Sequence, residues 1–466
     1  MRVAKLIAIL LASYGILTAS TNAYISHFSG NQIDVFDIET NTLLTPILVG
    51  NSPEFTTATP DGKTVFVSNT SDSTVSVIDT ATNTVIGSPI PVGSMPQYLA
   101  VSPDGNTLYV CTGGASAISY IDVASVLSGS PVTGTIPTGV GPNFVGFSID
   151  GSKGYTCDKT GNSITVFSTA TKNVIATISM NIGPTPTAIV FKPDGTKAYV
   201  SNATTPGSVS LIDLGSNTAS YITTNIGNSP GGITITPDGT KVLVANQLSN
   251  DISVIDTSTN SAPSPPVPCV TNPFGIAVTQ DSSKAFISSV SFGATSMSVY
   301  DINAATMSSI VVGGPTTYPT FYPDGTTLLT PLFDASGTLA LVAYPSLSVN
   351  TVTGLLPFPL WIAIASSSTL QPPTSLQGKK IQNEFLVYTV LLNTLNWQAP
   401  ASGASPVAYK IYRNAALTDL IGEVPASGPL SFTDQNVSKG ESITYFVVAV
   451  GASGDLSLPA SVTISR

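Results

Sequence analysis

An aspartate that returns about every 44 residues is the feature that most constrains the fold of this 466-residue chain. Successive copies are 43, 46, 44, 44, 43 and 43 residues apart, and five stand in a Pro-Asp-Gly triplet. The seven copies are Asp61, Asp104, Asp150, Asp194, Asp238, Asp281 and Asp324. In such a triplet the aspartate bonds to its own backbone and the glycine accepts a positive φ, so each copy predicts a tight turn between two strands. A fixed period of this length indicates one structural unit copied along the chain.

Each unit carries four short apolar segments that read as strands. In the unit around Asp104 we expect them at residues 97–102, 108–111, 118–122 and 131–136. Four strands in about 44 residues are typical of one blade of a β-propeller. The sequence therefore predicts an all-β fold whose larger part is a propeller.

The number of strands, rather than the number of turns, predicts eight blades. Segments of the second type start at Tyr24, Val65, Leu108, Gly154, Ala198, Val242, Ala285 and Leu328. The first copy begins at its second strand and the last copy, residues 360–365, ends after its first strand. One blade would then combine residues 24–49 with residues 360–365, which closes the ring and removes its open edges. Seven blades remain the alternative if these terminal strands do not join.

The two ends of the chain predict further segments. Arg2 and Lys5 precede an apolar run at residues 6–17, and small residues follow up to Ala23. This order is typical of a secretory signal peptide, so we expect an exported protein that is secreted, periplasmic or attached to the cell surface. No later stretch reaches the roughly 18 apolar residues of a membrane-spanning helix. The expected domains are a signal peptide at 1–23, a propeller at 24–368 and a smaller module at 369–466.

Composition excludes some classes of function. Only 9% of the residues are charged, and 16 Lys and Arg face 26 Asp and Glu. Nucleic-acid binding needs clustered cations, which this chain lacks. Residues 24–366 hold eight Lys and no Arg, so they offer no bidentate fork for a phosphate or carboxylate.

Several segments resemble a known repeat family. The runs Phe66-Val67-Ser68-Asn69, Tyr199-Val200-Ser201-Asn202 and Val75-Ser76-Val77-Ile78-Asp79 recur in register and are similar to the YVTN-type propeller repeats of surface-layer and exported proteins. The resemblance covers residues 24–366. It implies a propeller outside the cytoplasm and no single activity.

The C-terminal module has a different pattern. It contains Trp397 in a strand-like run, the run Tyr409-Lys410-Ile411-Tyr412-Arg413, and a third run around Tyr445. These are similar to the Trp-bearing and Tyr-bearing strands of a fibronectin type III β-sandwich, an immunoglobulin-like fold. We expect Trp397 and Tyr445 to pack in its core.

Three candidate reactive groups have simpler structural interpretations. His27, the one histidine, occupies a strand-end position that holds short polar residues in other units. Gly227-Asn228-Ser229-Pro230-Gly231 matches the G-x-S-x-G pattern, but it falls between two units rather than at a strand-to-helix elbow. Cys111 and Cys157 take a position where other units have small residues, so we expect buried free thiols.

These observations predict a non-catalytic protein, without metal or cofactor, that binds a protein or glycan through a neutral loop face. The expected binding residues at that face and at the channel mouth are Glu54, Gln97, Asn143, Met95, Asp72 and Asp251. Bulky charged residues at Gly93 and Gly183 are expected to abolish binding and leave folding intact. One alternative is a propeller enzyme of lactonase or lyase type that uses the central channel. Another is a structural surface-coat component, and the oligomeric state stays open.

Overall fold

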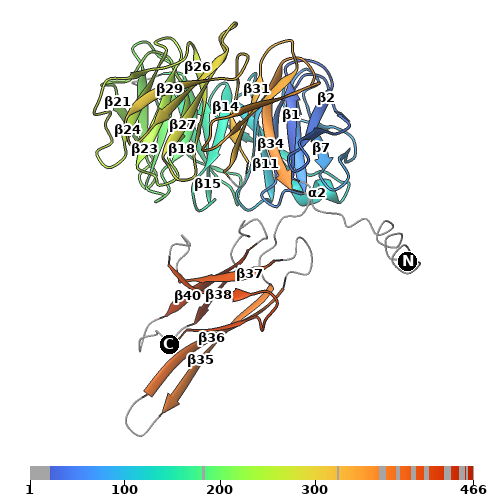
Figure 1. Ribbon diagram of the computed structural model, residues 1–466, viewed down its shortest axis with the longest axis vertical. Coiled ribbons are helices and arrows are strands. Elements are labelled where there is room, and N and C mark those ends of the chain that lie inside the picture. Colours follow the sequence, from blue (N-terminus) through green and yellow to red (C-terminus); the bar gives the residue numbers. More distant parts are fainter. Residues whose placement is uncertain are drawn as a thin grey trace, which may run out of the picture. The chain divides into compact units, whose positions relative to one another are not determined.

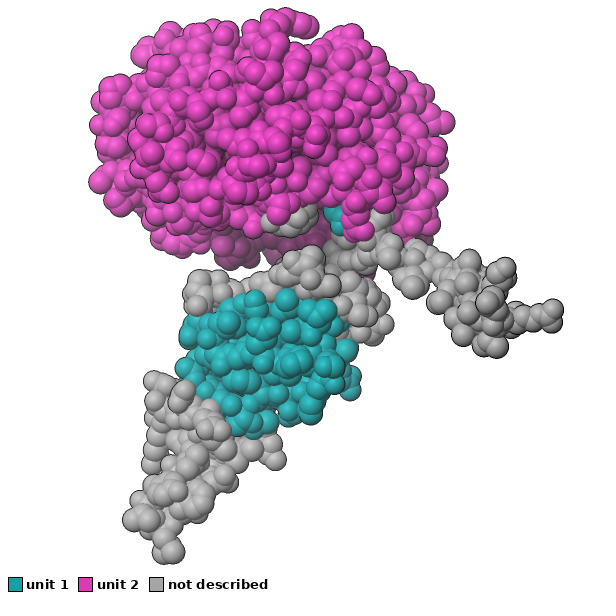
Figure 2. Space-filling model, in the orientation of Figure 1, with its two compact units in different colours: residues 1–22, 366–466 teal, residues 23–365 magenta. Residues whose placement is uncertain are grey.

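The computed structural model describes residues 21–180, 184–322, 325–366, 374–384, 389–399, 406–413, 419–434, 442–450, 457 and 460–464. One compact unit spans Ala23–Ala365, and the other includes Ser366–Arg466. Figure 2 colours these two units separately.

The described strands of the first unit form eight antiparallel sheets, each with four or more strands. Sheets 1 to 4 contain, in turn, β3 (Thr42–Leu43), β2 (Gln32–Asp37), β1 (Thr21–His27), β34 (Pro359–Ser366) and β4 (Ile47–Leu48); β5 (Pro53–Ala58), β6 (Thr64–Asn69), β7 (Thr74–Asp79), β8 (Thr84–Val85) and β9 (Ile90–Pro91); β10 (Pro96–Val101), β11 (Thr107–Thr112), β12 (Ala117–Asp122) and β13 (Thr133–Pro137); and β14 (Pro142–Phe147), β15 (Lys153–Asp158), β16 (Ser163–Ser168) and β17 (Val174–Ser179).

Sheets 5 to 8 repeat the same order of four strands. They contain β18 (Pro186–Phe191), β19 (Lys197–Asn202), β20 (Ser208–Asp213) and β21 (Thr218–Ile222); β22 (Pro230–Ile235), β23 (Lys241–Asn246), β24 (Asp251–Asp256) and β25 (Val267–Pro268); β26 (Pro273–Val278), β27 (Lys284–Ser289), β28 (Ser296–Asp301) and β29 (Thr306–Val311); and β30 (Thr320–Phe321), β31 (Thr327–Leu332), β32 (Thr338–Ala343) and β33 (Val349–Thr353).

Burial explains the order of strands within each sheet. The second strands are almost wholly buried on both faces, as in β6 and β11, whereas outer strands such as β17 are largely exposed. The first strands of neighbouring sheets contact one another, as β5 contacts β10 and β10 contacts β14. The first strands therefore surround the axis, and the apolar second and third strands fill the spaces between sheets. This arrangement is the β-propeller fold predicted from the repeat.

The ring is closed by segments from opposite ends of the sequence. β1 pairs with β34, and the two lie side by side in Figure 1. The hydroxyl of Ser26 accepts a hydrogen bond from the Trp361 N–H at 3.2 Å. This pairing is the one that the eight-blade prediction requires.

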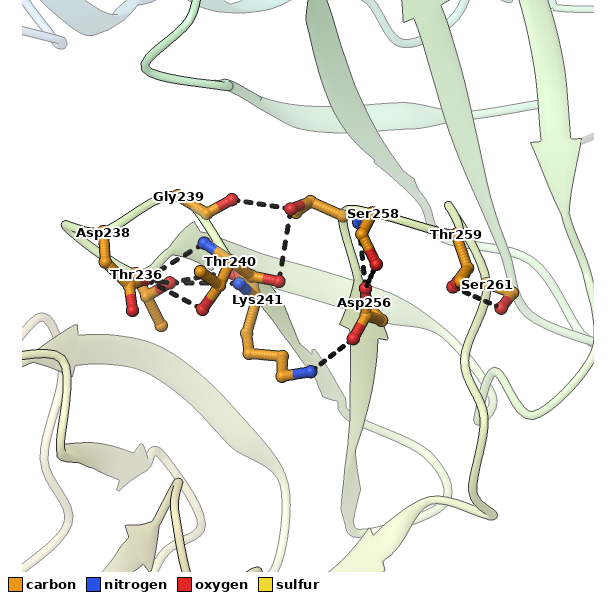
Figure 3. A network of polar contacts seen from close by, with 10 residues as sticks. Thr236, Asp238, Gly239, Thr240, Lys241, Asp256, Ser258, Thr259 and Ser261 are labelled. Carbon is orange, nitrogen blue, oxygen red and sulfur yellow. Dashed lines mark hydrogen bonds and ion pairs between the residues drawn. The ribbon is translucent and has the colours of Figure 1, made fainter.

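Alternating strand directions define two faces of the propeller. We call the loop face the side that carries the connections between sheets and those between second and third strands. The turn face carries the other connections, and Figure 3 shows one part of it. There the Asp238 carboxylate accepts the N–H of Thr240 at 3.0 Å, and Lys241 Nζ lies 2.5 Å from Asp256 Oδ2. Surface pairs of this kind contribute about 0 to 1 kcal/mol, so the recurring aspartates act mainly by fixing turns.

β1 begins at Thr21, and Ala23 within it is fully buried. A short helix, α2 (Val123–Leu127), follows β12, capped by Asp122, and accounts for the spacing of 46. Residues 1–20, Gly183 and Asp324 lie outside the described residues. In the described part of the chain no helix is long and apolar enough to cross a membrane.

The described strands of the second unit form two antiparallel sheets. One orders β35 (Thr374–Glu384), β36 (Thr389–Gln398) and β39 (Ser431–Asp434); the other orders β38 (Leu420–Pro425), β37 (Ala408–Tyr412), β40 (Ile443–Val450) and β41 (Ala460–Ile464). Trp397 and Tyr445 are buried in one apolar cluster that draws on both sheets, as predicted. The Asp434 carboxylate accepts the Tyr445 hydroxyl at 2.7 Å and pairs with Arg413.

Candidate functional site at the channel mouth

The inner strands begin at the loop face with an irregular step that aims side chains at the channel. In β5, Pro53 pairs with Asn69 and Phe55 with Ser68, so Glu54 has no partner across the ladder. β14 makes the same step around Asn143, and β10 makes a wider one that takes in Gln97. Bulges of this kind re-aim side chains and are common next to functional sites. The inner strands β18 (Pro186–Phe191), β22 (Pro230–Ile235) and β26 (Pro273–Val278) also have an irregular step. Residue identity therefore decides which of these sheets contribute chemistry.

Each inner-strand step is preceded by a backbone in the left-handed region. φ is positive at Ser52, Met95, Gly141, Thr185, Ser229, Asn272 and Phe358. Non-glycine residues adopt such values only where the surrounding structure holds them. The recurrence shows that this geometry belongs to the propeller. Ser229 is therefore a loop residue, equivalent to Ser52, and not a nucleophile at a strand-to-helix elbow.

Glu54 is the ionisable group of this step. Its side chain is half-buried, and burial raises its pKa, opposed by a hydrogen bond with Thr70. Its backbone carbonyl accepts the hydroxyl of Ser26 at 2.6 Å, which ties β5 to the closing sheet. A carboxyl whose pKa is raised by burial is a candidate general base or acid.

Gln97 and Asn143 occupy the same step in the next two sheets, with different surroundings. The Gln97 amide lies against the backbone of Gly113, where an added Cβ would come within 3.3 Å of Oε1. Asn143 Nδ2 donates to the carbonyl of Thr187 at 3.0 Å. Equivalent carbonyls in other sheets accept serine hydroxyls instead, as Gln97 accepts Ser68 and Gly231 accepts Ser201. Asn143 thus takes over a bond between sheets that Cys157 does not supply.

Three further predicted residues lie on the loop face without meeting at one point. Met95 is 52% exposed. Asp72 accepts the N–H of Asn51 at 2.7 Å, and this bond lowers its pKa. Asp251 accepts Asn246 Nδ2 at 2.7 Å. Asp72 and Asp251 therefore hold loops in place.

Gly93 is a packing position rather than a free loop site. A Cβ there would lie 2.9 Å from Thr112 Cγ2. The expectation that bulky residues at Gly93 leave folding intact is wrong, because the glycine lets the loop approach the end of β11.

His27 is part of a buried polar pair that recurs in other sheets. It lies 3.0 Å from Asp34, and both side chains are buried. Asn246 bonds Ser253 at 2.9 Å, and Asp158 accepts Thr165 at 2.6 Å, in the same register. Burial raises the pKa of Asp158, opposed by hydrogen bonds, the first of them from Thr165.

The cysteines form no disulfide. Cys111 and Cys157 are buried and free, and burial raises the pKa of both thiols. Cys269 is also free and less buried. Within the described ranges, no group of three or more His, Cys, Asp or Glu side chains is placed to hold a metal ion.

Aromatic rings from the inner strands contact one another around the axis, and the repeat pattern did not predict these contacts. They come from six consecutive sheets: Phe274, Tyr318, Trp361, Phe55, Tyr98 and Phe144. We call this set the aromatic arc. Four of its members stand two residues after an inner-strand proline, a signal that the aligned repeats contain.

Comparisons with known proteins bear on this site. A family model described as "Lactonase, 7-bladed beta-propeller" matches residues 93–265 and 150–309, which together are less than half of the chain. No curated protein matches. The model describes seven blades, whereas the described strands here form eight sheets.

Solved structures support the fold. Dihydro-heme d1 dehydrogenase NirN, in complex with DHE, has a TM-score of 0.58 at 16% identity, covering 72% of this chain and 74% of that one. Apo AztD from Citrobacter koseri has a TM-score of 0.56 at 12% identity, covering 76% and 99%. A putative 6-phosphogluconolactonase from Bacteroides uniformis has a TM-score of 0.50 at 16% identity, covering 74% and 99%. The chain is thus a β-propeller protein with similarity to lactonase-type propellers.

The family match corrects the predicted function. We expected a non-catalytic scaffold with a protein or glycan partner, and the matching model is instead that of an enzyme family. That expectation rested on the lack of a catalytic set built on a histidine or a metal ion. A single desolvated carboxylate, such as that of Glu54, can act as a general base without either.

Proposed function

We propose that this protein is a lactonase-type propeller hydrolase whose site is the loop-face mouth of the channel. The observation that carries the proposal is the half-buried Glu54 carboxyl, with its raised pKa, on an inner strand. The lactonase family match over residues 93–309 supports the reaction class.

In this mechanism Glu54 is the general base. Its carboxylate takes a proton from water while the water oxygen bonds to the lactone carbonyl carbon. The resulting oxyanion accepts a hydrogen bond from the Gln97 side-chain amide. The bond from that carbon to the ring oxygen then breaks, the ring oxygen receives the proton held by Glu54, and a hydroxy acid leaves.

The low positive charge of the loop face favours an uncharged lactone as the substrate. Residues 24–366 contain no Arg, and most of their Lys lie at the turn face, as Lys241 does. Lys159 follows β15 at the loop face and is exposed. One exposed lysine makes a weak phosphate site compared with an arginine fork.

A matched pair of variants tests the proposal. Glu54→Gln removes the base, whereas Glu39→Gln changes an exposed glutamate in the β2–β3 turn, on the opposite face. Purified protein is assayed for acid release from neutral five- and six-membered lactones. Glu54→Gln is expected to lose about 10²- to 10⁴-fold in rate and Glu39→Gln to keep full activity. Equal rates in both variants, or no hydrolysis of any lactone by the wild type, would refute this function.

We also propose the finer assignments that the sequence suggested. Eight blades rather than seven are supported by the eight sheets and the β1–β34 pairing. A fibronectin type III-like module at the C-terminus is supported by the strand orders of its two sheets. YVTN-type repeats and export after removal of a signal peptide complete the proposal; the mass of the mature protein tests the last point.

A further inference from the structure

The aromatic arc forms a continuous band inside the channel. The rings of Tyr98 and Phe144 are stacked, with centroids 4.1 Å apart and planes at 23°. The ring centroid of Trp361 lies 4.1 Å from that of Tyr318, 5.3 Å from that of Phe55 and 5.9 Å from that of Tyr98. Phe274 extends the band beyond Tyr318. The band is interrupted at sheets 5 and 6.

The propeller itself does not require these rings. Two residues after the inner-strand proline, sheet 5 has Ala188 and sheet 6 has Gly232. Those sheets keep the same first-to-second strand pairing as the others. Rings in the equivalent positions are therefore a property of this channel and not of the blade.

The rings of the arc are not fully buried by one another. All six side chains remain partly exposed. Burial raises the pKa of the Tyr98 and Tyr318 hydroxyls. A partly exposed aromatic ring can stack on a ligand ring.

The arc lies directly beside the proposed reacting groups. Phe55 follows Glu54 in β5, Tyr98 follows Gln97 in β10, and Phe144 follows Asn143 in β14. Each of these strands thus carries a polar residue at the mouth and a ring one residue deeper.

We propose that the aromatic arc binds an aryl ring of the substrate, which makes the substrate class an aryl-fused or aryl-bearing neutral lactone. This inference rests on the proposed function. The ester group lies beside Glu54 and Gln97, while the aryl ring stacks on the rings next to them. The lack of Arg in the propeller and the low charge of the loop face agree with a neutral ligand.

The chain contains its own reporter for this site. Its two tryptophans are Trp361 in the channel and Trp397 in the core of the second unit. In a Trp397→Phe protein, emission reports on Trp361 alone. The two probes are dihydrocoumarin, a lactone fused to an aryl ring, and δ-valerolactone, a lactone without one. Dihydrocoumarin is expected to change Trp361 emission saturably, and δ-valerolactone is expected to change it little.

Matched ring variants test the contact itself. Phe144→Leu and, in another sheet, Phe55→Leu shorten the arc. Phe147→Leu is the control, because Phe147 lies on the same strand as Phe144 and packs on Tyr109 between sheets. The two arc variants are expected to weaken dihydrocoumarin binding about 3- to 10-fold, with no change in the control. Thermal melts identify a variant that fails to fold. In that case the affinity of the other arc variant for dihydrocoumarin tests the contact.

The outcomes separate this inference from the proposed function. Saturable quenching by dihydrocoumarin without hydrolysis of either lactone would retain the aryl site and remove the lactonase assignment. Hydrolysis of both lactones with equal kcat/KM and no change in Trp361 emission would retain the activity and overturn the aryl site. Unchanged affinity in both arc variants would also overturn it.

Discussion

His27 Nε2 lies 3.0 Å from Asp34 Oδ2, and this buried pair fastens the end of the propeller to its beginning. The same Asp34 oxygen accepts the N–H of Leu356 at 2.7 Å, in the segment that leads into β34. In sheet 6 the corresponding atoms belong to Asn246, Ser253 and the loop residue Gly227, whose N–H donates to Ser253 at 3.1 Å. The histidine is thus a variant of a repeated clamp between a sheet and the loop before it.

The repeated polar pair predicts that a second substitution restores stability lost at His27. His27→Ala leaves Asp34 buried without its side-chain partner and is expected to lower the free energy of unfolding by about 3 kcal/mol. The double variant His27→Asn with Asp34→Ser installs the pair that sheet 6 uses and is expected to recover most of that loss. Urea unfolding of the three proteins provides the measurement. A double variant no more stable than His27→Ala would show that the pairs are not interchangeable.

Glu54 predicts opposite effects on activity and stability. Its pKa is raised in the folded protein, so the folded state holds the proton more tightly than the unfolded chain does. Stability contributed by this group therefore falls as pH rises from the unfolded pKa through the folded one. Glu54→Gln is expected to be more stable than wild type near about pH 7, with a smaller difference near about pH 4.

The same shift sets the pH dependence of hydrolysis. A general base acts in its ionised form, so kcat/KM is expected to rise with pH through a pKa above the ordinary glutamate value. The profile is measured with the neutral lactone that is hydrolysed fastest. A rate that is flat across this range would assign the base to another group.

A side chain at position 93 is expected to clash with Thr112 and lower stability, and a smaller residue at position 112 is expected to relieve the clash. Gly93→Ala places a Cβ 2.9 Å from Thr112 Cγ2 and is expected to cost about 1 to 3 kcal/mol. Thr112→Ala in the same chain removes the contacting methyl and is expected to restore part of the loss. Thermal unfolding of the single and double variants checks this. If the losses of stability in the two single variants simply add in the double variant, the contact between residue 93 and Thr112 is not the source of the strain.

Serine is expected to replace Cys111 or Cys157 with little loss of stability. Serine fills the same position in other sheets, where Ser68 and Ser201 donate to carbonyls of the next inner strand. Cys111→Ser and Cys157→Ser are expected to stay within about 1 kcal/mol of wild type, and Cys111→Leu to be strongly destabilised. Both thiols are expected to resist a disulfide reagent until the protein unfolds, since burial raises their pKa. Rapid labelling of the folded protein would contradict this.

Much of the fold follows from the repeated pattern alone. Local signals predict strands such as β6, β11 and β34. These signals are the turn aspartates, the apolar runs, and the blade that is shared between the two ends of the propeller sequence. The insertion of α2 was not foreseen, because residues 123–127 are also compatible with a connecting strand or loop.

The candidate site was foreseen only in part. Alignment of the repeats brought Glu54, Gln97 and Asn143 to one position, which the inner-strand step confirms. It did not reveal that Asn143 is engaged with Thr187, or that Asp72 and Asp251 bond to neighbouring loop and strand-end residues. The non-catalytic function expected from the lack of a histidine-based or metal-based catalytic set was wrong.

Local patterns are enough to predict the repeat, the four-strand unit and the segments that close the ring, because turn chemistry and strand alternation are properties of neighbouring residues. The contacts of Trp361 with Phe55 and Tyr98, and the pairing of His27 with Asp34 next to Leu356, appear only in the folded chain. The residues in several of these contacts are hundreds of positions apart. Their approach depends on how eight sheets close around one axis, which no local pattern encodes.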